Sequence, residues 1–131
     1  MSLYYVDTSA AAKLVLAEPD SAAMRRWAES HEPELCSCDI LRTELQRAVR
    51  RHAPQSMARV RDLLASIVLT TVSAELCERA ARVEPPPLRA LDALHLAAAL
   101  DLGNELDAMV TYDDRLAEAA QVNGIATISP R

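Results

Sequence analysis

The sequence predicts an α/β domain with helices on both faces of a central parallel sheet. Two observations lead to this prediction. Short apolar runs alternate with longer helical patterns along the whole chain, as they do where crossover helices join parallel strands. The 131 residues, half of them hydrophobic, also suffice to bury one core without disulfide bonds. We therefore expect a single domain over residues 1–131.

The first predicted strand covers 3–6, where LYYV is short and apolar. A helix over 8–16 follows it and ends before Pro19, since proline cannot continue a helix. The next helix is expected over 22–31, with Asp20 as a candidate for its capping residue. The chain thus opens on a strand and two helices.

The middle of the chain repeats this alternation. We predict a strand, two helices and a further strand, at 35–38, 39–52, 55–66 and 67–72. Asp39 is a candidate N-cap for the first of these helices, and Pro54 begins the second. The last strand is assigned from its β-branched residues.

The final third contains three more helices and two strands. We place them, in chain order, as helices at 73–83 and 88–103, a strand at 109–111, a helix at 113–124 and a strand at 125–128. Ser73 is expected to begin the first helix, whereas Gly103 and Gly124 close the other two. The three prolines at 85–87 are expected to hold an extended linker.

The charge and the cysteine content of the chain limit the kinds of ligand and the cellular compartment that we expect for it. With 19 acidic residues against 14 lysines and arginines, the net charge of −5 argues against a non-specific nucleic-acid binder. A polyanion would have to be bound locally, by a few arginines or a metal ion. Cys36 and Cys38 lie two apart in a predicted strand, so the three cysteines point to a reduced, cytoplasmic compartment. The most apolar segment is too short to cross a membrane.

Four acidic residues are candidates for a common site. Asp7 directly follows the first strand, and Asp113 lies two residues beyond the strand at 109–111. Glu44 is in the second turn of its helix, and Asp92 is near the start of another. In open α/β sheets, ligands bind beyond the carboxyl ends of the strands where the strand order reverses, so these acids can meet there.

Each acid also has a purely structural interpretation. Asp7 can be the N-cap of its helix, while Asp113 and Asp114 can be cap and first-turn acids. Glu44 can form a solvated ion pair with an arginine of its own helix. Taken singly, these positions do not require a catalytic role.

Asp92 is harder to explain by structure alone. It lies in LRALDALHLAAAL, which is so apolar that most of the helix must be buried. A buried carboxylate needs a partner, which could be His95 on the same helical face or a cation in a cavity. Converging carboxylates without lysine repel one another unless a hard divalent ion such as Mg²⁺ or Mn²⁺ compensates their charge.

Taken together, four segments resemble the PIN-domain family. They are YVDTSAAAKL, the helical Glu44 after the second strand, LRALDALHLAAAL, and MVTYDDRLAEAAQVNGI. The ordered set covers almost the whole chain and is most similar to the VapC-type toxin ribonucleases of bacterial toxin-antitoxin systems. The resemblance implies a three-layer α/β/α sandwich and a metal-dependent endoribonuclease that a cognate antitoxin inhibits.

The same resemblance implies roles for individual residues. The metal ligands and catalytic acids would be Asp7, Glu44, Asp92 and Asp113. Residues that order these carboxylates would be Thr8, Ser9, Thr111 and Asp114, with Thr8 and Ser9 also satisfying the helix N-terminus in place of Asp7. Phosphates of the RNA would meet Arg47, Arg51 and Arg89. The cofactor would be Mg²⁺ or Mn²⁺.

The expected function requires several binding partners. We expect an RNA substrate, an antitoxin protein and a homodimer, with the helical segments MRRWAESH and QSMARVRDLL offering apolar stripes for contact.

Two other functions are also compatible with the sequence. One is that of a metal-dependent phosphatase of similar topology, although the position of the second aspartate in the haloacid-dehalogenase arrangement is occupied by Ser9 here. The other is that of a PIN-fold module that binds a protein without catalysis.

Overall fold

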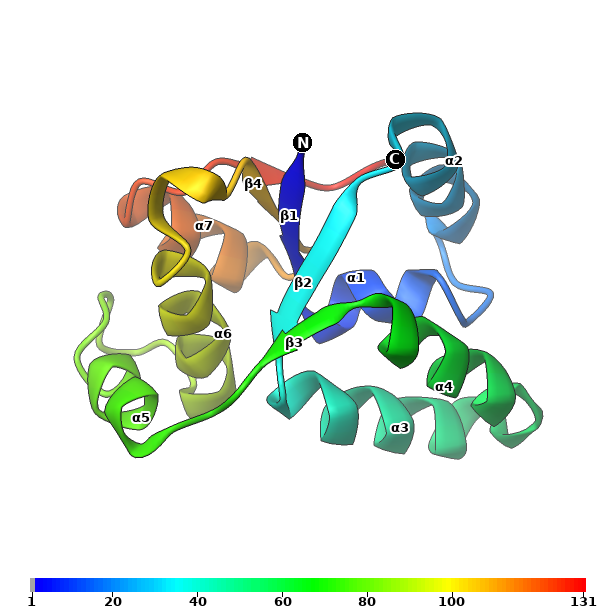
Figure 1. The fold of residues 1–131 in the computed structure, drawn as a ribbon, viewed down its shortest axis with the longest axis horizontal. Coiled ribbons are helices and arrows are strands. Elements are labelled where there is room, and N and C mark those ends of the chain that lie inside the picture. The colour runs from blue at the N-terminus through cyan, green and yellow to red at the C-terminus, as the bar shows by residue number, and fades with distance from the viewer. Residues whose placement is uncertain (1) are drawn as a thin grey trace.

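The computed structural model describes residues 2–131, in which five strands alternate with seven α-helices and two short 3₁₀ helices (Figure 1). The strands are β1 (Leu3–Val6), β2 (Glu34–Cys38), β3 (Val68–Thr70), β4 (Ala108–Val110) and β5 (Thr127–Ile128). The α-helices are α1 (Thr8–Lys13), α2 (Ser21–His31), α3 (Ile40–His52), α4 (Met57–Ser66), α5 (Ala74–Ala80), α6 (Ala90–Leu100) and α7 (Asp114–Val122). The 3₁₀ helices are η1 (Pro54–Ser56) and η2 (Gly103–Glu105).

All strand pairs are parallel, and the sheet order is β3-β2-β1-β4-β5. Tyr5 in the central strand pairs with Cys36 of β2 on one side and with Met109 of β4 on the other. The chain first builds outward from β1 to β3 and then returns to place β4 against the free side of β1. The strand order therefore reverses between β1 and β4, which is where α/β sheets bind ligands.

Helices cover both faces of the sheet, which confirms the predicted fold class (Figure 1). One face buries side chains of α5, α6 and α7, among them Leu76, Leu96 and Leu116. The opposite face is covered by α1 to α4, and Leu41 and Leu45 of α3 are fully buried there. The short strands thus lie between two apolar cores, one on each face of the sheet.

Several element boundaries differ from the sequence prediction. Helix α1 ends at Lys13 rather than at residue 16, and α6 ends at Leu100, before Gly103 begins η2. The triple-proline segment is not extended. It turns instead, with the Leu88 amide donating to the Pro85 carbonyl at 3.0 Å.

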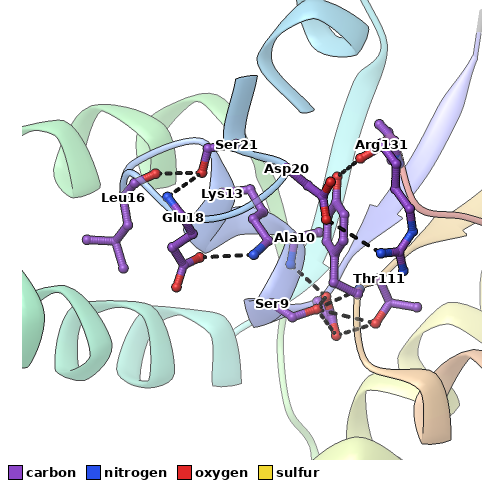
Figure 2. A network of polar contacts seen from close by, with 12 residues as sticks. Ser9, Ala10, Lys13, Leu16, Glu18, Asp20, Ser21, Thr111 and Arg131 are labelled. Carbon is purple, nitrogen blue, oxygen red and sulfur yellow. Dashed lines mark hydrogen bonds and ion pairs between the residues drawn. The ribbon is translucent and has the colours of Figure 1, made fainter. Parts of the chain in front are cut away.

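Helix capping agrees only partly with the sequence. The Ser73 hydroxyl accepts a hydrogen bond from the Leu76 amide, as expected for an N-cap. Asp20 and Asp39 occupy N-cap positions, but neither side chain caps its helix. The Asp20 carboxylate contacts Arg131 instead (Figure 2).

Two further sequence expectations can be checked in the fold. The three cysteines are free, and Cys36 and Cys38 are buried on one face of β2. Within residues 2–131, no helix combines the length and the apolar character needed to cross a membrane.

Candidate functional site

Asp7 lies at the carboxyl end of β1 and is almost completely buried. The Thr111 hydroxyl donates to its Oδ2 at 2.6 Å, and the Ser9 hydroxyl lies 2.7 Å from its Oδ1. Figure 2 shows Ser9 and Thr111 converging from the two segments that leave β1 and β4. The Tyr112 amide donates in turn to the Ser9 hydroxyl at 2.9 Å. The segments that follow β1 and β4, between which the strand order reverses, are therefore joined through the Asp7 carboxylate.

Asp7 is also the N-cap of α1. Its Oδ1 accepts a hydrogen bond from the Ala10 amide at 3.0 Å. The expectation that Thr8 and Ser9 satisfy this helix end is wrong, because the hydroxyls of both residues donate to carboxylates. Burial raises the pKa of Asp7, and the hydrogen bonds from Thr111, Ala10 and Ser9 oppose that shift only in part.

Glu44 reaches the same region from the second turn of α3. Its Oε1 accepts hydrogen bonds from the Thr8 hydroxyl at 2.8 Å and from Nε2 of His95 at 2.7 Å. Burial disfavours the charged carboxylate, but the contact with His95 outweighs burial and lowers the pKa of Glu44. Glu44 is therefore held as a carboxylate, and within residues 2–131 it pairs with His95 rather than with an arginine of its own helix.

His95 is completely enclosed and connects α6 to two other elements. Its Nδ1 lies 2.8 Å from the Tyr5 hydroxyl of β1, and its Nε2 bonds Glu44. Burial alone would lower the pKa of His95, but the adjacent Cys38 and Glu44 side chains raise it to about 10. The anticipated pairing of His95 with Asp92 is wrong, since the imidazole is committed to Glu44 and Tyr5.

This buried contact was missed at the sequence level. Tyr5 and Cys38 looked like ordinary strand residues, and nothing in their spacing indicated polar roles. The available signal was a histidine in an otherwise apolar helix, which requires polar partners from elsewhere in the fold. The partner could be identified only once the packing of α3 against α6 was known.

Asp92 and Asp113 border the same end of the sheet. Asp92 is half-buried in the first turn of α6, and Asp113 is the N-cap of α7, where its Oδ1 accepts from the amides of Arg115 and Leu116. Burial raises the pKa of Asp92, and the negative charges of Asp113 and Asp7 raise it further. The Asp113 amide also donates to the Thr111 hydroxyl at 3.1 Å.

Asp7, Glu44, Asp92 and Asp113 are named here the acidic cluster: the charges of Asp113 and Asp7 act on Asp92, and Glu44 bonds to Thr8, the residue that follows Asp7. Their donors are carboxylate oxygens, and the mutual repulsion at Asp92 is the kind that a divalent ion relieves. Across residues 2–131, however, no three His, Cys, Asp or Glu side chains are arranged closely enough to hold a metal ion. The donor chemistry thus fits Mg²⁺ or Mn²⁺, while coordination requires the carboxylates to draw closer together.

The remaining predicted residues lie at separate places, and the cavity beside Arg47 and Arg51 includes none of the four acids. Asp114 is exposed in the first turn of α7. Arg47 and Arg51 are exposed along α3 and line a surface cavity of about 660 Å³ with His52. Arg89 immediately precedes α6 and shares a separate groove with Asp92. Arg115, which the sequence did not single out, lines that groove too.

Comparison with known proteins identifies the family. The PIN domain family model matches residues 4–122. Ribonuclease VapC46 of Mycobacterium tuberculosis is 38% identical over 130 residues, covering 99% of both chains. Ribonuclease VapC47 of the same species is 39% identical over 132 residues, covering 98% of this chain and 97% of that protein.

Solved structures share the fold at lower sequence identity. The crystal structure of Mycobacterium tuberculosis VapC20, a Sarcin-Ricin loop cleaving toxin, superposes with a TM-score of 0.77 at 19% identity. The superposition covers 97% of this chain and 99% of the VapC20 chain. VapBC2 from Rickettsia felis, bound to a DNA fragment from its promoter, gives a TM-score of 0.72 at 12% identity and covers 98% and 99%.

Proposed function

The chain belongs to the PIN-domain family, and from this membership we propose that it is a metal-dependent endoribonuclease, the toxin of a bacterial type II toxin-antitoxin system. The relatives that cover its whole length are named as ribonucleases of the VapC group. The proposal covers hydrolysis of RNA phosphodiester bonds at the acidic cluster of Asp7, Glu44, Asp92 and Asp113.

One observation carries the proposal. The charges of Asp7 and Asp113 act on Asp92 at the point where the strand order reverses, although the three residues lie far apart in the sequence. Helix capping accounts for Asp7 and Asp113 but not for Asp92, whose ionisation the two neighbouring carboxylates disfavour. A site for Mg²⁺ or Mn²⁺ does account for it.

The side chains around the cluster have definite tasks in this proposal. Ser9 and Thr111 fix the orientation of Asp7, while Thr8 and His95 hold Glu44 as a carboxylate. A divalent ion bound there supplies positive charge to the scissile phosphate and makes an attacking water more acidic. The protein supplies the rigid framework that places these carboxylates before the substrate arrives.

The same proposal includes partners. An antitoxin is expected to block the acidic cluster, and the solved VapBC2 complex shows that a protein of this fold associates with a VapB partner. A homodimer remains part of the proposal, as do the phosphate contacts of Arg47, Arg51 and Arg89. We expect the protein to act in the cytoplasm, where RNA is available and cysteines stay reduced.

A cleavage assay on purified protein tests the function. Structured RNA is incubated with Mg²⁺ or Mn²⁺, with chelator, and with Asp7→Asn and Asp92→Asn variants. We expect cleavage by the wild type and a loss of about a hundredfold or more in each variant, because each removes a charged ligand. Asp62→Asn is the control, since Asp62 is exposed on α4, away from the cluster.

The outcomes separate the proposal from its alternatives. Cleavage that survives both chelator and the two substitutions would contradict the metal-nuclease proposal. A phosphatase would hydrolyse a phosphomonoester such as p-nitrophenyl phosphate and leave RNA intact. A binding module would cleave neither substrate but would still associate with its antitoxin.

A further inference from the structure

We propose that a groove between the triple-proline segment and α7 binds one nucleotide of the RNA substrate beside the acidic cluster. This linker groove has a volume of about 390 Å³, and its lining includes Pro85, Leu88, Arg89, Asp92, Arg115 and Val122. The volume falls within the range of small-molecule sites. The inference rests on the proposed function, because it assigns a substrate position next to the proposed reaction centre.

The groove is held open by contacts of the linker itself. The proline segment turns back through the hydrogen bond from the Leu88 amide to the Pro85 carbonyl. The Asn123 side chain at the end of α7 donates to the Glu84 carbonyl at 2.9 Å. The first contact fixes the turn within the linker, and the second ties the linker to the end of α7. The space between them is therefore part of the folded structure and does not need a ligand to create it.

The floor of the groove offers an exposed apolar surface. Val122 is 71% exposed and is one of three large hydrophobic side chains that stand out on the surface of residues 2–131. Pro85 is exposed as well, and Leu88 is half-buried next to it. The faces of nucleobases are apolar whatever the base, so they can pack on such a floor without sequence readout.

The charged residues of the groove suit a phosphate. Within residues 2–131, neither Arg89 nor Arg115 forms an ion pair with an acidic side chain. Guanidinium groups bind phosphate oxygens through paired hydrogen bonds. Glu118 also lines the groove, where its carboxylate disfavours a second phosphate but can accept a hydrogen bond from the amino group of a base.

The position of the groove selects RNA over another occupant. Asp92 belongs to both the groove and the acidic cluster, so the groove borders the cluster at this side chain. A nucleotide seated in the groove therefore lies beside the proposed reaction centre. The groove then supplies binding energy for the RNA substrate close to the reacting bond.

RNA binding measured without cleavage tests this inference. A fluorescein-labelled single-stranded RNA is titrated in chelator, and its anisotropy reports affinity. We expect Arg115→Gln to lower affinity about tenfold and to reduce the slope of log affinity against log salt by about one. Val122→Asn should lower affinity severalfold and leave that slope unchanged, because no charge is removed.

Matched controls come from the opposite side of the molecule. Arg61→Gln on α4 removes an exposed arginine, and Val68→Asn on β3 replaces a valine that is 53% exposed. Both should bind RNA as the wild type does. In the active protein, Arg115→Gln should raise KM with little change in kcat, because the groove contributes binding rather than chemistry.

Three results would overturn the inference. RNA affinity could be the same in the groove variants as in the wild type, or it could fall equally in Arg61→Gln and Arg115→Gln. The groove variants could also keep RNA affinity and lose only antitoxin affinity, which would assign the groove to the protein partner. Groove-dependent RNA binding by a wild type that never cleaves RNA would reject the proposed function and keep the groove.

Discussion

At the scale of single residues, Asp7 shows how a capping aspartate can also serve a charged cluster. Its carboxylate accepts from one backbone amide of the helix end and from two hydroxyls. Burial nevertheless disfavours its charge, and the pKa of Asp7 is raised. The folded protein therefore binds a proton at this carboxyl more tightly than the unfolded chain does.

The difference in the pKa of Asp7 between the folded and unfolded states predicts that the stability of the protein depends on pH. A carboxyl with a raised pKa in the folded state contributes stability below its unfolded pKa of 3.8, and this contribution is lost as pH rises through the folded value. In chelator, Asp7→Asn should therefore become progressively more stable than the wild type as pH rises from 3.8 towards neutrality. Urea unfolding at a series of pH values measures the difference.

Asp62→Asn provides the comparison, because its carboxylate is exposed on α4. If the difference between Asp7→Asn and wild type stays flat across the range, or changes in the opposite direction, the burial argument for Asp7 does not hold.

The places of the candidate site residues in the fold could be predicted from the sequence better than their contacts could. Asp7 and Asp113 could be placed at one sheet edge because each follows a strand, and this reasoning needs only strand assignment. The partner of His95 could not be found in this way. The spacing within one helix made Asp92 a possible partner for His95. Spacing within a helix says nothing about neighbouring helices, and the approach of α3 to α6 brought Glu44 to the imidazole instead.

At the scale of elements, the start of α7 combines capping with the proposed chemistry. Asp113 Oδ1 accepts from two backbone amides of the first turn, at 2.9 and 3.1 Å. An asparagine can make the same two bonds, and asparagine and aspartate cap helices about equally well. The structural role of this position and its charge can therefore be separated.

We predict that Asp113→Asn retains the stability of the wild type within a few tenths of a kcal/mol and loses most RNA cleavage. Asp113→Ala should lose cleavage too and should also cost about 1 kcal/mol in free energy of unfolding, because the cap is removed. Denaturant unfolding and the cleavage assay are compared on both variants. Full cleavage by Asp113→Asn would remove this residue from the proposed site.

Element boundaries were predicted less well than element order. The order of strands and helices follows from hydrophobic periodicity, which the chain shows clearly. The end of α1 at Lys13 and the turn at the triple proline depend on tertiary contacts. In the proline segment the Leu88 amide donates to the Pro85 carbonyl, and the Asn123 side chain donates to the Glu84 carbonyl. Hydrophobic periodicity cannot predict such bonds.

At the scale of the whole molecule, two cores share one thin sheet. Leu96 of α6 is fully buried on one face, and Leu45 of α3 is fully buried on the other. The strands between them are two to five residues long and cannot remain ordered without both covers. The two halves should therefore unfold together, as a single domain does.

Leu96→Ala tests this cooperativity. It should cost about 2 to 5 kcal/mol in free energy of unfolding, the usual range for a leucine removed from a packed core. Trp27, the one tryptophan of the chain, packs on the opposite core, yet its fluorescence should report the same lowered midpoint as circular dichroism. Leu45→Ala is the matched substitution. Two separate transitions would show that residues 1–131 do not form one cooperative unit.

The hydrogen bond between Asp7 and Thr111 joins positions that are 104 residues apart. A ribosome releases the segment of Asp7 early and that of Thr111 much later. Until β4 has emerged and inserted beside β1, the nascent chain holds Asp7 without the strand that completes its surroundings. The topology thus delays assembly of the acidic cluster until late in synthesis.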